Sequence, residues 1–477
     1  MRHRIAMARA ASGSGHARRR ALFALALALS LITALALPVA AHAATGDIFP
    51  YDVQQKTLQN GLKVMAIPFD SPGIVAYVTV VRTGSRDEVE PGHSGFAHFF
   101  EHMMFRGTKK HPATEYNDAL KAMGADSNAN TSDDRTFYYI VGPSSKLETM
   151  FDLESDRFMN LDYAEDAFRT EAGAILGEYS KNASNPFLPL DEKTRDLAFA
   201  RHTYKHTTIG FLADVKDMPN QYAYSKSFFQ RFYRPENSIL LVVGDVKPEQ
   251  VFTLADKYYT AWKRGYQPPA VVAEPAPAGP QRAHLDWASP TNPYLTISYR
   301  TPAFAADRTW AALQVIEQLL FAESAPLYQQ LVVDKQWVDF AGGDFDPHRD
   351  PYLFGIYARV RGDELMPKVE SAIHEALVGL QTKPVDAARL ARVKSHLRYA
   401  FAIGLDSPMA VARQVGRLLW LTGDVPALNQ LWREIDAVTP ADVQRAAKEV
   451  FQEKGMTVVT LSHPKAAGEG EQKGGSR

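Results

Sequence analysis

The segment QPPAVVAEPAPAGPQ, residues 267–281, constrains the fold of this chain more than any other stretch. It is rich in proline and alanine and carries one charged residue. This composition favours an extended, semi-rigid spacer rather than a helix or a strand. It separates two parts of similar length, 44–266 and 282–463, so we predict two domains joined by a linker. The last residues, 464–477, lack an apolar face, and we predict a disordered tail there.

Both parts alternate strand-like and helix-like segments. Short β-branched and aromatic runs bounded by turn residues are typical of strands, and apolar residues three to four apart are typical of helices. The strand candidates are 73–85, 128–142, 237–246, 294–302 and 353–362, and the helix candidates are 146–160, 247–262, 309–320, 364–380 and 388–405. The similar order of elements predicts an α+β fold with two structurally similar domains, although no residue-level repeat is visible.

The N-terminal residues have the pattern of a secretory signal peptide. Three arginines, 18–20, precede an apolar run at 21–37, and Ala41-His42-Ala43 has the small-x-small form of a cleavage site. We therefore expect residues 1–43 to be removed and the protein to be periplasmic. The apolar run is short for a membrane span, and no second one follows. Retention of this segment as an N-terminal anchor is an alternative that the sequence leaves open.

The overall composition argues against several classes of partner. Hydrophobic residues make up 45% and charged residues 22% of the chain, as in an ordinary globular protein. The formal net charge of −1 gives no electrostatic reason to expect binding to nucleic acid or to an anionic membrane. The chain has no cysteine and therefore forms no disulfide, which suits an exported bacterial protein.

The stretch GFAHFFEHMMFRGT, residues 95–108, carries the clearest chemical signal. On a helix, His98, Glu101 and His102 fall on one narrow stripe, and aromatic residues and methionines cover most of the remaining surface. We predict a buried helix with Ser94 as its N-cap. Ionisable groups on a buried stripe are costly unless something pairs with them, and a divalent cation is one such partner. The residues alone also allow a histidine pair that is satisfied by hydrogen bonds.

H-x-x-E-H is the inverted zincin motif, and its surroundings resemble the pitrilysin family, which includes insulin-degrading enzyme and mitochondrial processing peptidase. The resemblance covers most of the first part and, more loosely, the second. Its segments, in the family's order, are NGLKV (60–64), TGSRDE (83–88), residues 95–108, NANTSDDRTFYY (128–139) and FYRPENSILLVVGDV (232–246). The resemblance implies mostly antiparallel sheets packed with helices, which together form half of a clamshell-like chamber.

The resemblance also implies a set of zinc ligands. The family's third ligand is a glutamate on a later helix, and Glu178 in RTEAGAILGEYSKN has the matching spacing. His98, His102 and Glu178 would then hold one Zn²⁺ per chain with one coordination position open, which is the catalytic arrangement. Glu101 is expected to be the general base, and Glu171 resembles the family's second acidic residue, which supports the site.

A zinc-dependent endopeptidase that cleaves unfolded peptides or small polypeptides is the function that the resemblance implies. In the family an extended peptide adds to an edge strand beside the metal. The matching residues are Asn128, Ala129, Asn130 and Thr131. The alternative function is a non-catalytic assembly or peptide-binding subunit.

The second part departs from the family pattern at one point. Active members carry a leucine followed by an arginine and, seven residues later, a tyrosine, and both side chains stabilise the oxyanion. Here Val332 follows Leu331, and Asp339 stands seven residues on. We expect a heterodimer whose zinc-less homologous partner supplies the arginine and tyrosine. A homodimer that uses other residues, or a different register, is the other interpretation.

Overall fold

The computed structural model describes residues 47–464, and the chain separates into two compact units, Met1–Pro50 and Tyr51–Arg477. Residues 47–50 of the first unit form no helix or strand. The predicted signal peptide, 1–43, lies outside the described residues, as does the predicted tail apart from Pro464. None of the helices within residues 47–464 has the length and the apolar character needed to span a membrane.

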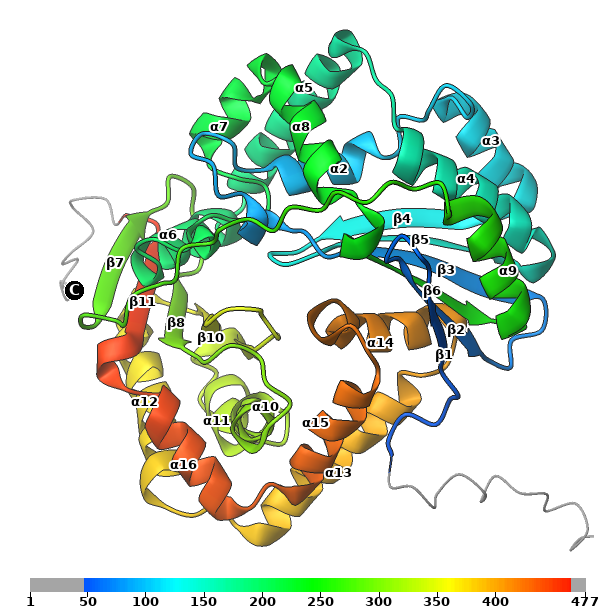
Figure 1. Ribbon diagram of the computed structural model, residues 1–477. Coiled ribbons are helices and arrows are strands. Elements are labelled where there is room, and N and C mark those ends of the chain that lie inside the picture. The colour runs from blue at the N-terminus through cyan, green and yellow to red at the C-terminus, as the bar shows by residue number, and fades with distance from the viewer. Residues whose placement is uncertain (1–46, 465–477) are drawn as a thin grey trace, which may run out of the picture. The chain divides into compact units, whose positions relative to one another are not determined.

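The second unit contains two β-sheets (Figure 1). The first has six strands in the order β1-β2-β6-β3-β5-β4. All neighbouring strands in it are antiparallel except β2 and β6. The strands are β1 (Gln54–Thr57), β2 (Lys63–Pro68), β3 (Ile74–Val81), β4 (Asp126–Thr131), β5 (Thr136–Pro143) and β6 (Ser238–Gly244).

The second sheet repeats the topology of the first. Its order is β7-β11-β8-β10-β9, with β7 and β11 parallel and the other pairs antiparallel. Strands β2–β6 and β7–β11 therefore follow the same path, and β1 is an addition. This confirms the predicted α+β fold with two similar, mostly antiparallel sheets. The strands are β7 (Gln281–Asp286), β8 (Tyr294–Arg300), β9 (Val338–Asp344), β10 (Leu353–Val360) and β11 (Met456–Ser462).

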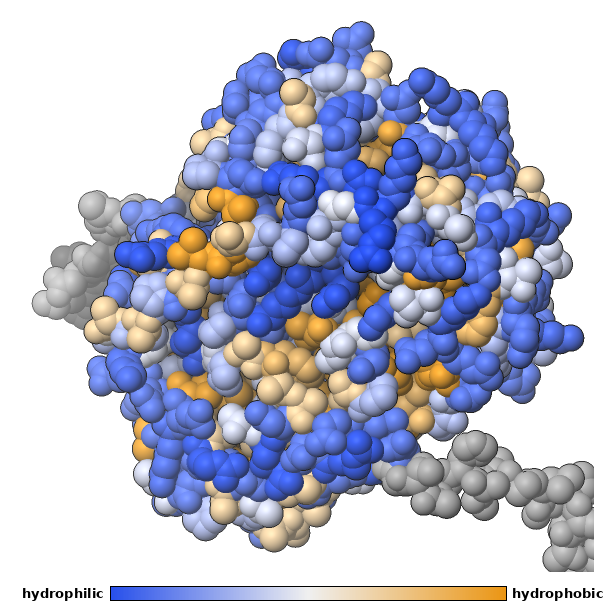
Figure 2. All heavy atoms as spheres, viewed as in Figure 1, coloured by the Kyte–Doolittle hydropathy of each residue, from blue (hydrophilic) through white to orange (hydrophobic). Residues whose placement is uncertain are grey.

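Helices pack on both sheets. The first part holds α2 (Phe96–Met103), α3 (Ala113–Met123), α4 (Leu147–Asn160), α5 (Glu165–Ala183), α6 (Phe187–Ala198), α7 (Leu212–Asp217), α8 (Tyr222–Phe232) and α9 (Pro248–Tyr259). The second holds α10 (Arg308–Phe321), α11 (Pro326–Tyr328), α12 (Met366–Thr382), α13 (Ala387–Ile403), α14 (Pro408–Thr422), α15 (Pro426–Ala437) and α16 (Pro440–Val450). On the face of the molecule seen in Figure 2, hydrophilic residues predominate.

The predicted linker has no helix or strand over 267–280, and β7 begins at Gln281. The two parts nevertheless contact each other, because α14 of the second part packs on β3 and β6 of the first sheet. At Gly416 of α14 an added Cβ would lie 3.0 Å from the ring of Phe137 on β5, so the helix and the sheet are in close contact there. That the two parts are separate domains joined by a linker stays a prediction.

The segment 128–142 is a hairpin rather than the single strand that the sequence predicted. Strand β4 ends at Thr131, residues 132–135 form the turn, and β5 begins at Thr136. The Ser-Asp-Asp sequence in this segment is a turn signal. The sequence analysis did not use it, because the aromatic run that follows favoured a single strand. As a consequence, β4 becomes the edge strand of the first sheet, paired only with β5.

Candidate metal centre

Helix α2 begins one residue later than expected. Its N-cap is Gly95, in the left-handed region at φ 92°, and not Ser94. The Ser94 hydroxyl donates instead to Asp214 at 2.6 Å. The N–H groups at the start of the helix, which have no acceptor within it, donate to Glu88, from Gly95 at 2.7 Å and from Ala97 at 2.6 Å. A fully buried carboxylate thus fixes the start of this helix.

The apolar side of α2 is buried as predicted. Phe96, Phe99, Phe100 and Met103 have no solvent exposure. Phe100 stacks on Phe228 of α8 at a centroid distance of 5.3 Å. This packing orients the helix, so that the histidine stripe turns toward α5.

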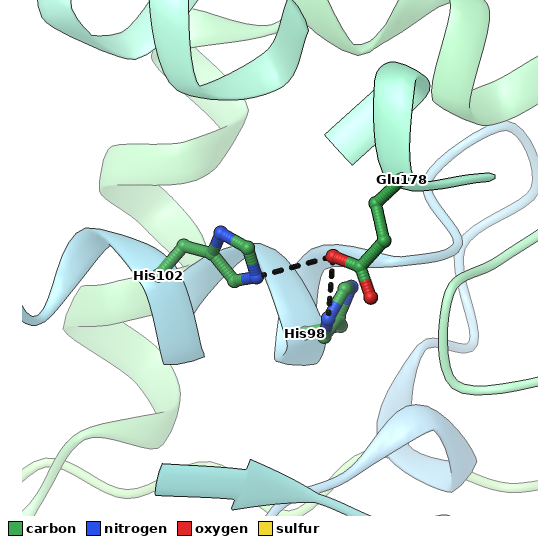
Figure 3. Close-up of side chains that lie close together, drawn as sticks. All are labelled: His98, His102 and Glu178. Carbon is green, nitrogen blue, oxygen red and sulfur yellow. Dashed lines mark ion pairs between the residues drawn. The ribbon is translucent and has the colours of Figure 1, made fainter. Parts of the chain in front are cut away.

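His98, His102 and Glu178 meet at one point (Figure 3). Glu178 reaches the site from α5, and its Oε2 lies 3.7 Å from His98 Nε2 and 3.5 Å from His102 Nε2. One donor atom from each of the three residues lies within 4.8 Å of the others. The structure therefore brings together the three residues that the sequence analysis singled out as candidate ligands.

The spacing of these atoms suits a small tetrahedral cation. Ligands at about 2.0–2.2 Å from zinc stand about 3.3–3.6 Å from one another, close to the two measured separations. Burial lowers the pKa of His98 to about 4, although Glu178 acts in the opposite direction. The ring of His98 is thus neutral near pH 7 and has a lone pair free. The hydrogen bond to Glu171 raises the pKa of His102 instead, so this ring loses a proton when it binds a metal. Two imidazoles and one carboxylate form a donor set that zinc prefers.

Glu171 and Arg106 hold the ring of His102. His102 Nδ1 donates to Glu171 Oε1 at 2.9 Å, and Arg106 Nε donates to Glu171 Oε2 at 2.5 Å. Because Nδ1 carries the proton in this bond, the lone pair of Nε2 is directed toward Glu178. Burial acts to raise the pKa of Glu171, but the bonds from His102 and Arg106 bring it below its ordinary value. Sequence reasoning missed Arg106, although its position one turn after His102 was a usable signal.

Glu101 stands outside the three-residue group. Its Oε2 accepts from the Thr131 hydroxyl at 2.6 Å, and the main chain of Thr131 also bonds to it. Burial raises the pKa of Glu101, and the Thr131 hydroxyl acts to lower it. The carboxylate lines an open cavity of about 370 Å³ together with His102 and Asn128. Glu101 is thus a carboxylate with a raised proton affinity that lies next to the histidines and remains accessible.

The four residues predicted to bind substrate form most of β4. The Ser132 N–H bonds to the Arg135 carbonyl, so alternate residues Asn130 and Asn128 are those paired to β5. The main-chain groups of Ala129 and Thr131 consequently point away from the sheet. The Ala129 N–H donates to the side-chain oxygen of Asn128 at 2.8 Å. The free edge of β4 therefore runs past Glu101.

The positions expected for the arginine and tyrosine lie in the second part. Val332 is in the π-helical turn Gln329–Asp334. Asp339, on β9, pairs with Arg361 at 2.9 Å and with Arg359 at 3.2 Å. Neither residue can donate a hydrogen bond to a developing oxyanion, because valine is apolar and an ionised aspartate only accepts.

Two family models match the chain. "Insulinase (Peptidase family M16)" matches residues 65–210, and "Peptidase M16 inactive domain" matches residues 221–397. The first match contains His98, Glu101, His102, Glu171 and Glu178. The two matches lie on either side of α7, and the second one begins before β6 of the first sheet and ends before β11.

Curated proteins and solved structures agree with these matches. The zinc protease PqqE of Helicobacter pylori is 28% identical over 85% of this chain and 91% of the relative, and the probable mitochondrial-processing peptidase subunit beta of Schizosaccharomyces pombe is 24% identical over 84% and 89%. A crystal structure of a protease from Helicobacter pylori superposes with a TM-score of 0.82 at 28% identity, covering 87% of this chain and all of that one. The periplasmic protease PqqL from Escherichia coli superposes with a TM-score of 0.71 at 20% identity, covering 87% of this chain and 48% of that one.

Proposed function

Because the chain belongs to peptidase family M16, the insulinase family, we propose that it is a zinc-dependent endopeptidase that hydrolyses unfolded peptides. The observation that carries this proposal is the meeting of His98, His102 and Glu178, with the free carboxylate of Glu101 beside them. Relatives named zinc proteases support zinc as the metal.

His98, His102 and Glu178 would hold one zinc ion per chain. When bound there, zinc lowers the pKa of a coordinated water molecule and polarises the carbonyl of the scissile peptide bond. Three protein ligands leave one coordination position for that water, in contrast to the four of a closed structural site. The Glu171 carboxylate keeps His102 in the required tautomer, and Arg106 anchors Glu171 from the other side.

Glu101 would act as the general base. A carboxylate in this position accepts a proton from the attacking water and later returns it to the leaving amine. Its raised pKa makes it a better proton acceptor, and the bonds from Thr131 fix its orientation. Thr131 belongs to β4, so a hydrogen bond joins the general base directly to the proposed substrate-binding strand.

The substrate would bind as an additional strand on β4. The outward main-chain groups on this edge are those of Ala129 and Thr131, of which the Thr131 N–H already bonds to Glu101. A peptide must first replace the bond between the Ala129 N–H and the Asn128 side chain. Recognition through main-chain groups requires an extended peptide, which excludes a folded protein segment as the substrate.

We further propose a heterodimer with a zinc-less homologous subunit that supplies the arginine and tyrosine. Two observations support this proposal: Val332 and Asp339 occupy the positions expected for those residues, and one relative is named as the beta subunit of a processing peptidase. A homodimer is the alternative. Co-expression with a zinc-less homologue tests the proposal, since full activity of the isolated chain would remove the need for a partner.

We place the protein in the periplasm, as an expectation from the sequence pattern of residues 1–43. A structural neighbour, the periplasmic protease PqqL from Escherichia coli, supports this location. Fractionation of cells that express the full chain, with N-terminal sequencing of the product, tests both export and cleavage before Ala44.

The second candidate function is a non-catalytic subunit that binds peptides. It is favoured by the "inactive domain" match at residues 221–397 and by the absence of the arginine and tyrosine at the expected positions. The meeting of His98, His102 and Glu178, with the Glu101 carboxylate beside them, favours the hydrolase instead.

A quenched fluorescent peptide library separates the two candidates. The zinc-loaded protein should cleave members of the library, and a chelator should stop the cleavage until zinc is restored. Glu101→Gln should keep its zinc and lose about 10²–10⁴-fold in kcat/KM, the contribution typical of a general base. Wild-type activity in this variant would refute the role of Glu101. If the zinc-loaded wild type, together with its partner, cleaves no peptide, the peptide-binding subunit is the candidate function that remains.

A further inference from the structure

A large polar cavity lies between the first sheet and the second part of the chain. Its volume is about 790 Å³, and it is separate from the smaller cavity at Glu101. It is bounded by β4, the 132–135 turn and β5 on one side and by residues 344–348 and α14 on the other. The charged side chains that line it are Asp133, Asp134, Arg135, Arg195, Asp344, Asp346, Arg413 and Arg417, with His348 beside them.

Most of these charges are already paired. Arg195 bonds to Asp133 at 2.8 Å, and His348 bonds to the same carboxylate at 3.2 Å. Arg417 on α14 bonds to Asp346 at 2.5 Å. These pairs leave no net charge at Asp133 or Asp346 to attract a ligand.

Arg135 and Arg413 differ from these paired charges. Over the residues that the structure describes, neither guanidinium forms an ion pair with a carboxylate. Arg135 lies over the ring of Phe137 at 5.3 Å and reaches Asn130 Oδ1 at 3.4 Å. Arg413 lies over the ring of Tyr139 at 5.7 Å and is otherwise exposed to the cavity. Burial lowers the pKa of Arg135, although the nearby carboxylates of Asp346 and Asp134 act in the opposite direction.

On the far side of the cavity, Asp346 attracts Arg135 but is itself paired with Arg417. Burial raises the pKa of Asp344, and it raises the pKa of the neighbouring Glu317 to about 7. Burial therefore disfavours the charged form of both carboxyl groups. Arg135, beside β4, and Arg413, on α14, are therefore the two lining arginines without an ion pair within the described residues.

The register of the hairpin relates this wall to the proposed substrate strand. Asn130 is paired directly with Phe137, and Asn128 with Tyr139, so all four side chains point to the same face of the sheet. Arg135 and Arg413 cover that face at Phe137 and Tyr139. Thr131, one residue along, points to the opposite face, where it bonds to Glu101.

A peptide added to β4 would present its side chains alternately to the two faces. A side chain on the Glu101 face would lie beside the metal centre, and a neighbouring one would point toward Arg135 and Arg413. Because one strand residue spans about 3.3 Å, this second side chain belongs to a residue within about two positions of the scissile bond.

We propose that Arg135 and Arg413 form a subsite that selects peptides with an aspartate or glutamate at this position. The inference rests on the proposed binding of peptides along β4, and it adds a substrate class to it. A carboxylate fits because it can accept charge-assisted hydrogen bonds from a guanidinium group, and neither arginine forms an ion pair within the described residues. A lysine at the same position would meet two like charges.

Fluorescent decapeptides provide the test. In one series a single glutamate is moved through each position of a neutral sequence, and in a second series lysine replaces it. Affinity is measured by fluorescence anisotropy with the full-length Glu101→Gln protein loaded with zinc, and kcat/KM is measured with the wild type. The same measurements are made in the Arg413→Glu and Arg135→Gln backgrounds.

Arg392→Glu is the matched control, since this arginine is exposed on α13 and does not line the cavity. At one position glutamate should bind at least about tenfold more tightly than lysine, and added salt should weaken the preference. Arg413→Glu should abolish or reverse the preference, Arg135→Gln should reduce it, and Arg392→Glu should leave it intact. Equal affinities at every position, or a preference that survives Arg413→Glu, would overturn the subsite.

The outcomes separate this inference from the proposed hydrolase. Cleavage without charge preference keeps the hydrolase and overturns the subsite. Charge-selective binding to the Glu101→Gln protein, lost in Arg413→Glu, supports the subsite even if the wild type cleaves nothing. Absence of binding for every peptide in both series overturns the subsite.

Discussion

Replacing Glu171 by glutamine removes the charge that orients His102, and its effect can be estimated from the structure. The Glu171 carboxylate is 3% exposed and accepts from His102 on one oxygen and from Arg106 on the other. Glutamine has a single side-chain oxygen, so its amide group must face one of these two donors. One hydrogen bond is then lost, and the other is no longer assisted by a charge.

Hydrogen bonds to charged groups contribute about 1.5–3 kcal/mol each. Loss of such a partner to a metal-bound histidine typically costs 10–100-fold in metal affinity, which corresponds to about 1.4–2.7 kcal/mol. The two ranges overlap, so we expect Glu171→Gln to weaken zinc binding about 10–100-fold. The ring of His102 would remain in place but would be less firmly held in the tautomer that presents Nε2 to the ion.

Competition with a chromophoric chelator measures the zinc affinity of each protein. Glu165→Gln is the control on the same helix, because Glu165 forms an exposed pair with Arg169 at 2.7 Å. Exposed pairs of this kind contribute about 0.3–0.5 kcal/mol to stability, and this one is remote from the histidines. A folded Glu171→Gln protein with the zinc affinity of the wild type would refute the role given to Glu171.

Two further predictions concern the general base and the core. Thr131→Val removes a hydroxyl that lowers the pKa of Glu101, so the pKa of Glu101 should rise. Because the base acts when deprotonated, the acid limb of the kcat/KM profile should move to higher pH. Thr131→Ser keeps the hydroxyl and should keep the wild-type profile. Glu154→Gln should lower the free energy of unfolding by about 3–5 kcal/mol in denaturant titrations, because it leaves the fully buried guanidinium of Arg157, now bonded at 2.7 Å, without its anion. An unmoved acid limb in the first case, or a loss below about 1 kcal/mol in the second, would contradict these assignments.

The family and the fold were predictable from the sequence because their signals are local or periodic. The stripe formed by His98, Glu101 and His102 follows from helical geometry, and β-branched runs identified most of the strands. The contact of Glu178 with the histidines joins two distant helices, and only the family resemblance pointed to it. The structure brings these side chains together, and their role as zinc ligands is a proposal that measurement must decide.

Other features depend on contacts that no local pattern reveals. Ser94 has the residue type of an N-cap, but its hydroxyl is engaged by Asp214, and Glu88 bonds to the start of α2 instead. The packing of α14 against β5, which places Arg413 over Tyr139, joins the two parts of the chain. Propensity and periodicity describe single helices and strands, so tertiary contacts of this kind cannot be predicted from them.

The position of zinc in a crystal of the zinc-loaded protein, located by anomalous diffraction at the zinc edge, tests the central claim most directly. The account predicts one strong peak per chain, at about 2.0–2.2 Å from His98 Nε2, His102 Nε2 and a carboxylate oxygen of Glu178, with Glu101 outside the coordination sphere. A peak elsewhere in the chain, or zinc bound without Glu178, would contradict it.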